Sequence, residues 1–250
     1  MKPAPEWSED RLLDGRVKLT QARRGYRVAM DPVFLAAAVP AQPGERVLDI
    51  GTGSAAASLC LIQRVAGVAV DGLEIQEPLC RLAERNRHLN GAGDCLRILP
   101  GDLLAPPAAL ERAYDHVMAN PPHLEAAKAS PVATPERATA HVEGEARLGD
   151  WVRFALRLAK PLATLTFLHR FDRREELLAL LSEGAGALKA FPLLPMIGKP
   201  AKRVLVQGRK GAAPSVTLCK GLRLHNAEGA YTEEAQAVLR AGKALPLDLA

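Results

Sequence analysis

Residues 118–123 read MANPPH, a stretch that sets one amide side chain between an apolar run and two prolines. Pro121 and Pro122 donate no backbone N–H and hold φ near about −65°, so no helix or strand continues through them. Asn120 precedes a proline, which restricts it to extended backbone. The turn therefore fixes the Asn120 amide and the neighbouring carbonyl groups, and the amide oxygen and the Pro121 carbonyl can accept two N–H bonds.

Three further groups of residues could bind a ligand. The stretch DIGTGSA begins at Asp49, and its glycines let the backbone approach a ligand while the next helix offers free N–H groups. Glu74 lies 25 residues beyond Asp49, where an acid can accept both hydroxyls of a ribose. Gly101 and Asp102 form the third group. A glycine-rich turn alone is a weak signal, but these features in order indicate a nucleotide-type site.

The elements that must position these residues alternate along the chain. Short apolar segments predict strands at 46–50, 68–75, 96–102, 114–120 and 164–170, and helical patterns cover 55–65, 78–90, 148–159 and 173–182. Two last strands are predicted at 187–196 and 203–210. We expect an α/β fold: a Rossmann-like, mostly parallel seven-stranded sheet with helices on both faces, ending in an antiparallel hairpin. Ligands bind such sheets at the carboxyl ends of the strands, where the residues above lie.

We expect residues 1–250 to form a single domain with three parts. Residues 1–30 predict a hairpin or lid, with strands at 16–21 and 26–30 joined by a turn at 23–25. The catalytic core spans 31–211 and opens with an apolar helix at 32–39. A C-terminal extension, 212–250, contains a short helix at 232–240.

Composition excludes several classes of protein. The chain has no apolar run of about 18 residues, so we expect no membrane span, and its start lacks a signal-peptide core, which favours the cytoplasm. The four cysteines are scattered without metal-ligand spacing, so no metal site is expected.

The formal net charge is +5, and no acidic residue lies between Glu183 and Glu228. This stretch contains eight basic residues, among them Lys199, Lys202 and Arg203. Either a polyanion-binding surface or a solvated basic face explains this asymmetry.

Together the motifs resemble those of class I S-adenosylmethionine-dependent methyltransferases. D-x-G-x-G resembles the first motif of that family, Glu74 its ribose-binding acid, Gly101-Asp102 its adenine-side acid, and Asn120-Pro121-Pro122 the (N/D)-P-P-(Y/F/W) motif of amino methyltransferases. The resemblance implies S-adenosyl-L-methionine as cofactor. It also implies a set of cofactor-binding residues: Asp31, Asp49, Gly51, Thr52, Gly53, Ala55, Glu74, Ile75, Gly101, Asp102 and Asn120. For Asp31, a helix N-cap followed by proline is an equally good interpretation.

The segments 16–40 and 198–211 are similar to bacterial small-domain methyltransferases, the group related to the tRNA1(Val) adenine-37 N6-methyltransferase. This resemblance implies methylation of an exocyclic adenine amine in tRNA. Its catalytic turn would comprise Asn120, Pro121, Pro122 and His123. Lys199, Lys202 and Arg203 are the candidate phosphate contacts. The alternatives are a protein glutamine N-methyltransferase, a small-molecule methyltransferase, or a cofactor-binding protein without transfer activity.

Two positions depart from the family pattern. Ala55 replaces a glycine, which costs roughly 1 kcal/mol or more if that position requires positive φ. His123 replaces the aromatic residue after N-P-P, and it either stacks in its place, indicates another substrate, or accompanies a loss of transfer. Residues 124–147 follow as a long polar segment that we expect to act as a substrate lid.

Overall fold

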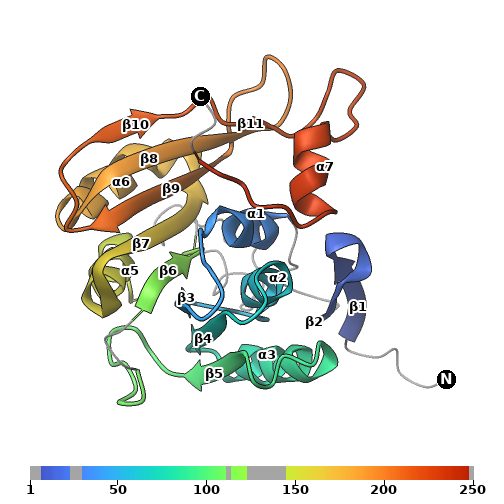
Figure 1. Cartoon of the computed structure of the whole chain (residues 1–250), viewed down its shortest axis with the longest axis vertical. Coiled ribbons are helices and arrows are strands. Elements are labelled where there is room, and N and C mark those ends of the chain that lie inside the picture. The colour runs from blue at the N-terminus through green and yellow to red at the C-terminus, as the bar shows by residue number, and fades with distance from the viewer. Residues whose placement is uncertain (1–6, 23–29, 111–113, 123–144, 248–250) are drawn as a thin grey trace.

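The computed structural model describes residues 7–22, 30–110, 114–122 and 145–247. One large sheet dominates it, with strand order β10-β8-β9-β7-β6-β3-β4-β5 and β11 beside β8 (Figure 1). All seven predicted strands are present: β3 (Arg46–Ile50), β4 (Ala69–Glu74), β5 (Leu96–Pro100), β6 (Tyr114–Ala119), β7 (Ala159–Arg170), β8 (Ala185–Leu194) and β9 (Arg203–Lys210). Strands β3 to β7 pair in parallel, whereas β9 is antiparallel to both β7 and β8.

Helices cover both faces of this sheet, as the alternating pattern predicts (Figure 1). The alternation of side chains along β3 separates two cores, because Val47 joins one apolar cluster whereas Leu48 and Ile50 join the other. The first cluster holds residues from α1 (Asp31–Ala38), α2 (Ala56–Arg64), α3 (Glu77–Leu89) and α7 (Glu233–Leu239). The second holds residues from α5 (Leu148–Leu158) and α6 (Arg174–Ser182). In the described part of the chain, no helix is long and apolar enough to cross a membrane.

The N-terminal hairpin contains a strand that was not predicted. Strand β2 (Val17–Ala22) covers most of the predicted segment 16–21 and pairs in antiparallel fashion with the preceding β1 (Trp7–Leu12). The chain reverses in a short 3-10 segment, Leu13–Gly15, where Asp14 and Gly15 have φ of 57° and 89°. The turn predicted at 23–25 and most of the strand predicted at 26–30 lie outside the described residues.

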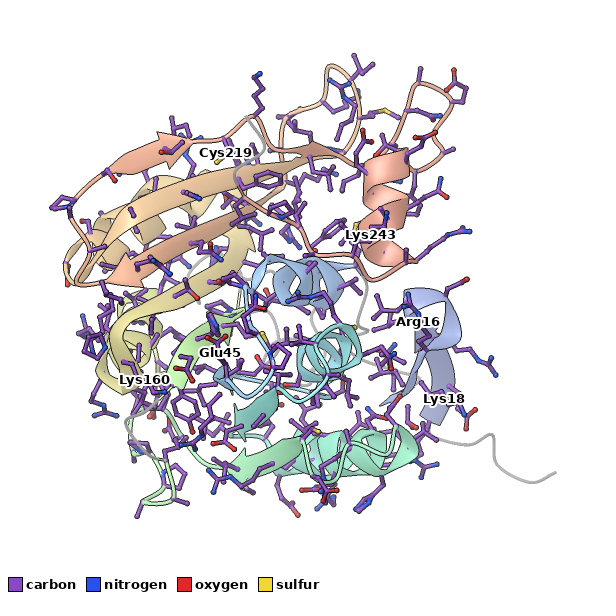
Figure 2. The ribbon with its side chains drawn as sticks, viewed as in Figure 1. Arg16, Lys18, Glu45, Lys160, Cys219 and Lys243 are labelled. Carbon is purple, nitrogen blue, oxygen red and sulfur yellow. The ribbon has the colours of Figure 1, made fainter. Side chains whose placement is uncertain are left out.

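Asn86 of α3 and Asn90, the C-cap residue of that helix, dock this hairpin on the main domain. The Asn86 amide accepts from the Thr20 N–H at 2.7 Å and donates to the Thr20 carbonyl at 3.1 Å. Asn90, one helical turn further, makes the same pair of bonds with Lys18 at 2.8 and 2.7 Å. Two side chains one helical turn apart thus form hydrogen bonds with the backbone of two alternate residues of β2, as a neighbouring strand would. Lys18 and Arg16 mark the hairpin in Figure 2.

The C-terminal extension adds two short strands to the outer side of β8, which the sequence did not predict. Strand β10 (Val216–Leu218) pairs in parallel with 188–190, and β11 (Leu222–Arg223) pairs with Leu193 and Leu194. Pro192 lies between the two pairings, and proline has no N–H to give to a ladder. Gly221 passes so close that a Cβ there would lie 2.2 Å from the Pro192 carbonyl oxygen. The outer side of β8 therefore pairs with two separate short strands, β10 and β11, and not with one continuous strand.

Candidate active site

The predicted site residues gather at one edge of the sheet, the carboxyl edge, where β3 to β6 end. These strands are neighbours in the order β6-β3-β4-β5, and their last residues lie level in the parallel register: Ile50 with Ala119 and Leu73, and Glu74 with Pro100. Gly51, Ile75, Gly101 and Asn120 each follow one of these strands directly. The fold therefore brings the four groups together.

The loop after β3 exposes its backbone to open space. Gly51 and Thr52 donate their N–H groups to the Leu73 carbonyl at 2.8 and 3.0 Å, which ties the loop to β4. Gly53 has φ of +58°, and a Cβ built there would meet no atom within 4 Å. A ligand can therefore approach the backbone at Gly53 without displacing protein atoms.

Trp151 of α5 packs beneath the same loop. Gly51 has φ of +68°, and a Cβ there would lie 2.6 Å from Cη2 of the Trp151 ring. Trp151 is 9% exposed and belongs to the core. Its ring also sets how closely the glycine loop can approach α5, a role that helical periodicity does not reveal. Only glycine satisfies both the backbone angle and the contact at position 51.

Asp49 supports this loop from below. Thr52 Oγ1 and Ser58 Oγ donate to the same carboxylate oxygen, Oδ2, at 2.8 and 2.7 Å. Burial raises the pKa of Asp49 to about 6, against the lowering effect of these two hydroxyls and with a further rise from Glu74. Thr52 in turn packs against Gly72 of β4, where a Cβ would lie 2.8 Å from its Cγ2. Neither Ser58 nor Gly72 belongs to a motif, so neither carries a signal in the sequence.

Glu74 ends β4 with both carboxylate oxygens held by backbone groups. Gly53 N–H donates to Oε2 and Gln76 N–H to Oε1, each at 2.9 Å. Burial raises the pKa of Glu74, although its bonds to backbone N–H groups oppose the rise. The next residue, Ile75, has 63% of its surface exposed. The Glu74 carboxylate, held in place by backbone N–H groups, thus lies beside the exposed apolar side chain of Ile75. The carboxylate suits the hydroxyls of a ribose, and the apolar side chain suits the flat face of its base.

Gly101 and Asp102 form the turn after β5. Gly101 N–H donates to the Glu74 carbonyl at 2.9 Å, which joins this turn to the end of β4. A Cβ at Gly101 would lie 2.6 Å from Cδ of Pro107, so glycine is required for close packing. Asp102 Oδ1 accepts the N–H of Leu104 at 2.9 Å, and the side chain is partly exposed.

Ala55 occupies the N-cap of α2 with φ of 65° and ψ of 23°. The position therefore requires the left-handed backbone in which glycine is favoured, and alanine bears that strain here. Its N–H donates to the Thr52 carbonyl at 2.9 Å, and its methyl group is fully buried.

Asn120 follows β6 and leaves an acceptor unused. Its side-chain Oδ1 is buried and has no hydrogen-bond partner among the described residues. Pro121 beside it is buried, and Pro122 is partly exposed. A buried acceptor without a donor costs roughly 1–3 kcal/mol, so this geometry favours a ligand that brings an N–H group to it.

The opposite edge of the sheet, the amino edge, shows a different pattern. There His116 Nε2 lies 2.8 Å from Glu45, and the Tyr114 hydroxyl donates to Asp71 at 2.6 Å. Lys160 pairs with Asp115 at 2.6 Å. Glu45 and Lys160 are labelled in Figure 2. The named polar groups of the amino edge are thus satisfied within the protein, whereas Asn120 Oδ1 of the carboxyl edge has no donor among the described residues.

Asp31, predicted as a cofactor residue, and Arg203, predicted as a phosphate contact, form an ion pair with each other. Arg203 Nε lies 2.8 Å from Asp31 Oδ2, which joins the start of β9 to the start of α1. Lys199 and Lys202 are exposed in the loop before β9.

His123 and residues 124–144, to which we assigned a stacking and a lid role, lie outside the described residues. The described residues contain no cluster of three or more histidine, cysteine or acidic side chains that could hold a metal ion.

The chain is similar to known methyltransferases. Residues 29–141 match the family described as Methyltransferase small domain. The chain is 28% identical over 223 residues to the tRNA1(Val) (adenine(37)-N6)-methyltransferase of Tolumonas auensis, covering 89% of this chain and 85% of that protein. The enzyme of the same name from Erwinia tasmaniensis is 32% identical over 119 residues, covering 47% of this chain and 48% of that one.

Solved structures show the same fold. A predicted O-methyltransferase from Agrobacterium tumefaciens superimposes with a TM-score of 0.72 at 23% identity, over 86% of this chain and 97% of that chain. TYW2 of Pyrococcus horikoshii, in complex with MeSAdo, gives a TM-score of 0.58 at 15% identity, over 84% of this chain and 73% of that chain.

Proposed function

The chain is a methyltransferase that carries the methyltransferase small domain at residues 29–141, and from this premise we propose that it transfers a methyl group from S-adenosylmethionine to an exocyclic adenine amine of tRNA. The observation that carries the proposal is the buried Oδ1 of Asn120 at the carboxyl edge, which has no hydrogen-bond partner in the part of the chain that the structure describes. Similarity to the adenine(37)-N6-methyltransferase of Tolumonas auensis over most of both chains supports the choice of substrate.

The residues at the carboxyl edge fit this cofactor. Glu74 offers an anchored carboxylate for the ribose hydroxyls, and exposed Ile75 offers an apolar surface for the adenine. Asp102 lies on the adenine side, and the backbone at Gly53 faces open space for the rest of the molecule. When bound, the cofactor supplies an electrophilic methyl group on a positively charged sulfur.

Asn120 and Pro121 would then orient the nucleophile. The lone pair of an exocyclic adenine amine is delocalised into the ring, which makes the amine a weak nucleophile. Two N–H bonds, one to Asn120 Oδ1 and one to the Pro121 carbonyl, direct that lone pair toward the methyl group. The same acceptors stabilise the positive charge that grows on the nitrogen in the transition state. Positioning of this kind needs no general base.

The basic stretch supports an RNA substrate through its arrangement. Lys199 and Lys202 lie in the loop between β8 and β9, at the carboxyl edge, and Lys220 and Arg223 flank β11 at the end of β8. Arg209, by contrast, lies near the far end of β9, opposite Thr164. Four exposed cations therefore border the edge that carries Asn120, where phosphates next to a target base would lie.

The second candidate is a protein glutamine N-methyltransferase. A glutamine amide also presents two N–H groups, and Asn120 with Pro121 would hold it in the same way. The stretch 184–227 carries eight basic and no acidic residues, which an amide in a protein does not need, and this favours the RNA substrate.

Methyl transfer to a mixture of undermodified tRNA and cell protein tests the proposal. We expect label from the S-adenosylmethionine methyl group to be lost on RNase digestion and to appear in N6-methyladenosine. Label that is lost only on protease digestion would move the substrate to an amide side chain.

Charge reversal tests the surface separately. Lys199→Glu and Lys202→Glu should weaken tRNA binding and reduce the slope of log K against log salt, by about one unit for each phosphate that the variant no longer neutralises. Arg209→Glu, an equal change in charge at the far end of β9, is the matched control. Cofactor binding should stay the same in all three variants.

A further inference from the structure

The N-terminal hairpin carries two cations directly opposite each other on its outer face. In the antiparallel register of β1 and β2, Arg11 pairs with Lys18, and both residues are exposed. Like charges at directly opposed positions of two strands are destabilising. Glu9 shares this face, but neither cation forms an ion pair with it or with any other acid in the part of the chain that the structure describes. The protein alone therefore leaves the repulsion between Arg11 and Lys18 in place.

A third cation of the hairpin, Arg16, lies where the two ends of the chain meet. Its guanidinium donates to the carbonyl groups of Leu13 and Arg240, and within the described ranges no carboxylate pairs with it. A Cβ at Gly242 would lie 3.3 Å from Nη2 of Arg16. Arg240 and Lys243, on either side of this glycine, are exposed, and Figure 2 labels Lys243 and Arg16. Positive charge from both ends of the chain thus gathers beside the hairpin.

The sequence of this region and one aromatic residue favour a nucleic acid as the partner of these cations. Residues 15–30 contain five basic and no acidic residues, three of the five lying outside the described residues. Trp7 lies on the same face of β1 as Arg11 and is 38% exposed. Cations that track a phosphate backbone, together with an aromatic ring on which a base can stack, are typical of surfaces that bind single-stranded nucleic acid.

The hairpin is held beside the glycine loop of the proposed cofactor site. One atom, Nδ2 of Asn86, donates both to the Thr20 carbonyl in β2 at 3.1 Å and to the Ser54 carbonyl in the glycine loop at 3.0 Å. Lys18 lies two residues from Thr20, about 7 Å along the strand. Its own backbone is bonded to Asn90 at 2.8 and 2.7 Å. The hairpin therefore presents its cations from a fixed position next to the site.

We propose that the outer face of the hairpin binds the sugar-phosphate backbone of the RNA substrate outside the target base, an inference that rests on the proposed function. RNA phosphates would lie against Arg11 and Lys18 and offset the repulsion between them. Release of the counterions condensed on the RNA makes this contact favourable and dependent on salt. Contacts of this kind orient the RNA and add affinity without reading its sequence.

Lys18→Glu tests the proposal, because it places an acid opposite Arg11. The unbound variant should unfold at the same temperature as the wild type or at a higher one, so a folding defect would not account for weaker binding. For an undermodified tRNA that the wild-type enzyme methylates, we expect weaker binding and a slope of log K against log salt that is smaller by about one unit. Lys18→Arg keeps the charge and should bind as the wild type does. Cofactor affinity should be the same in both variants.

Arg157→Glu is the matched control, because Arg157 is an exposed cation of α5, which packs on the other face of the sheet. It should leave the affinity for tRNA and the salt slope as they are in the wild type. An unchanged slope in Lys18→Glu, an equal loss in Arg157→Glu, or a lower unfolding temperature of Lys18→Glu would overturn the inference and leave the proposed function standing. Failure of the wild-type enzyme to methylate any RNA would instead overturn the proposed function.

Discussion

Asn86 of α3 pairs with both backbone groups of Thr20 in β2, and with the same amide nitrogen it also donates to the Ser54 carbonyl in the glycine loop at 3.0 Å. This fully buried side chain therefore joins the N-terminal hairpin to the proposed cofactor site.

Asn86→Ala should lower the free energy of unfolding by about 3 kcal/mol, because it leaves buried backbone groups of Thr20 without partners. Asn90→Ala removes equivalent bonds at a partly exposed position and should cost about 1 kcal/mol. Urea unfolding followed by tryptophan fluorescence measures both. Equal costs would show that water replaces the Asn86 bonds and that the amide does not hold the hairpin.

Asn120→Ala should separate binding from transfer. We expect kcat to fall by about 10² or more, since the variant loses an interaction with the charge that develops on the amine. Cofactor affinity, measured by calorimetry, should change little. Asn120→Asp keeps an oxygen acceptor and should recover part of the activity. Loss of cofactor binding in Asn120→Ala would assign Asn120 to the cofactor alone.

Gly51→Ala should disturb the glycine loop in two ways. The new Cβ would overlap the Trp151 ring and would occupy a backbone with positive φ, so cofactor affinity should fall at least about tenfold. Trp151→Phe in the same chain should restore part of the affinity by removing the overlap, although the backbone strain remains. A double-mutant cycle measures this coupling, and simple additivity would exclude the overlap with the ring as the cause.

The buried carboxylate of Asp49 should make stability depend on pH. Burial raises its pKa from an ordinary value of 3.8 to about 6 in the folded chain, so the folded state binds more protons between these values. Stability from this group is therefore fully present below about pH 4 and is lost as the pH rises through about 6. Between pH 4 and pH 7, the free energy of unfolding of Asp49→Asn relative to the wild type should shift by about 2 kcal/mol in favour of the variant. Denaturant titrations at a series of pH values measure it, and a constant difference would contradict the raised pKa.

Ala55→Gly should change stability by less than about 1 kcal/mol. Relief of the left-handed strain gains about 1 kcal/mol, whereas loss of a buried methyl group and a more flexible unfolded chain cost a similar amount. Ala55→Val should be destabilising by about 2 kcal/mol or more, since a β-branched side chain is both strained and crowded there. Thermal unfolding measures both variants. A large gain from glycine would mean that the methyl group packs poorly.

The sheet and the gathering of the candidate residues at one of its edges could be predicted because both depend on local patterns. Apolar alternation locates β3 to β9, and the polar residues that follow β3 to β6 must meet at one edge once the strands are parallel. The pairing of the hairpin could not be derived in this way, since a strand such as 17–22 does not encode which neighbour it joins. Trp151 shows the same limit, because helical spacing assigns it to the core but says nothing of the glycine above it.

Contacts between distant segments were also missed. The ion pair of Asp31 with Arg203 joins residues 172 positions apart, and neither residue carries a signal for the other. The two asparagines at 86 and 90 have the right spacing for a common helix face, but only the fold shows that a strand lies against that face.

The split strands β10 and β11 also bear on how the protein can be shortened. Strand β8 is ten residues long, and without its two short partners it would be the bare margin of the sheet. Its unpaired N–H and C=O groups would then be open to strands of other molecules, which is a common origin of aggregation. A chain cut after Lys210 would keep the residues of the proposed cofactor and catalytic site, but it would lose Lys220, Arg223 and the segment that covers this margin of the sheet.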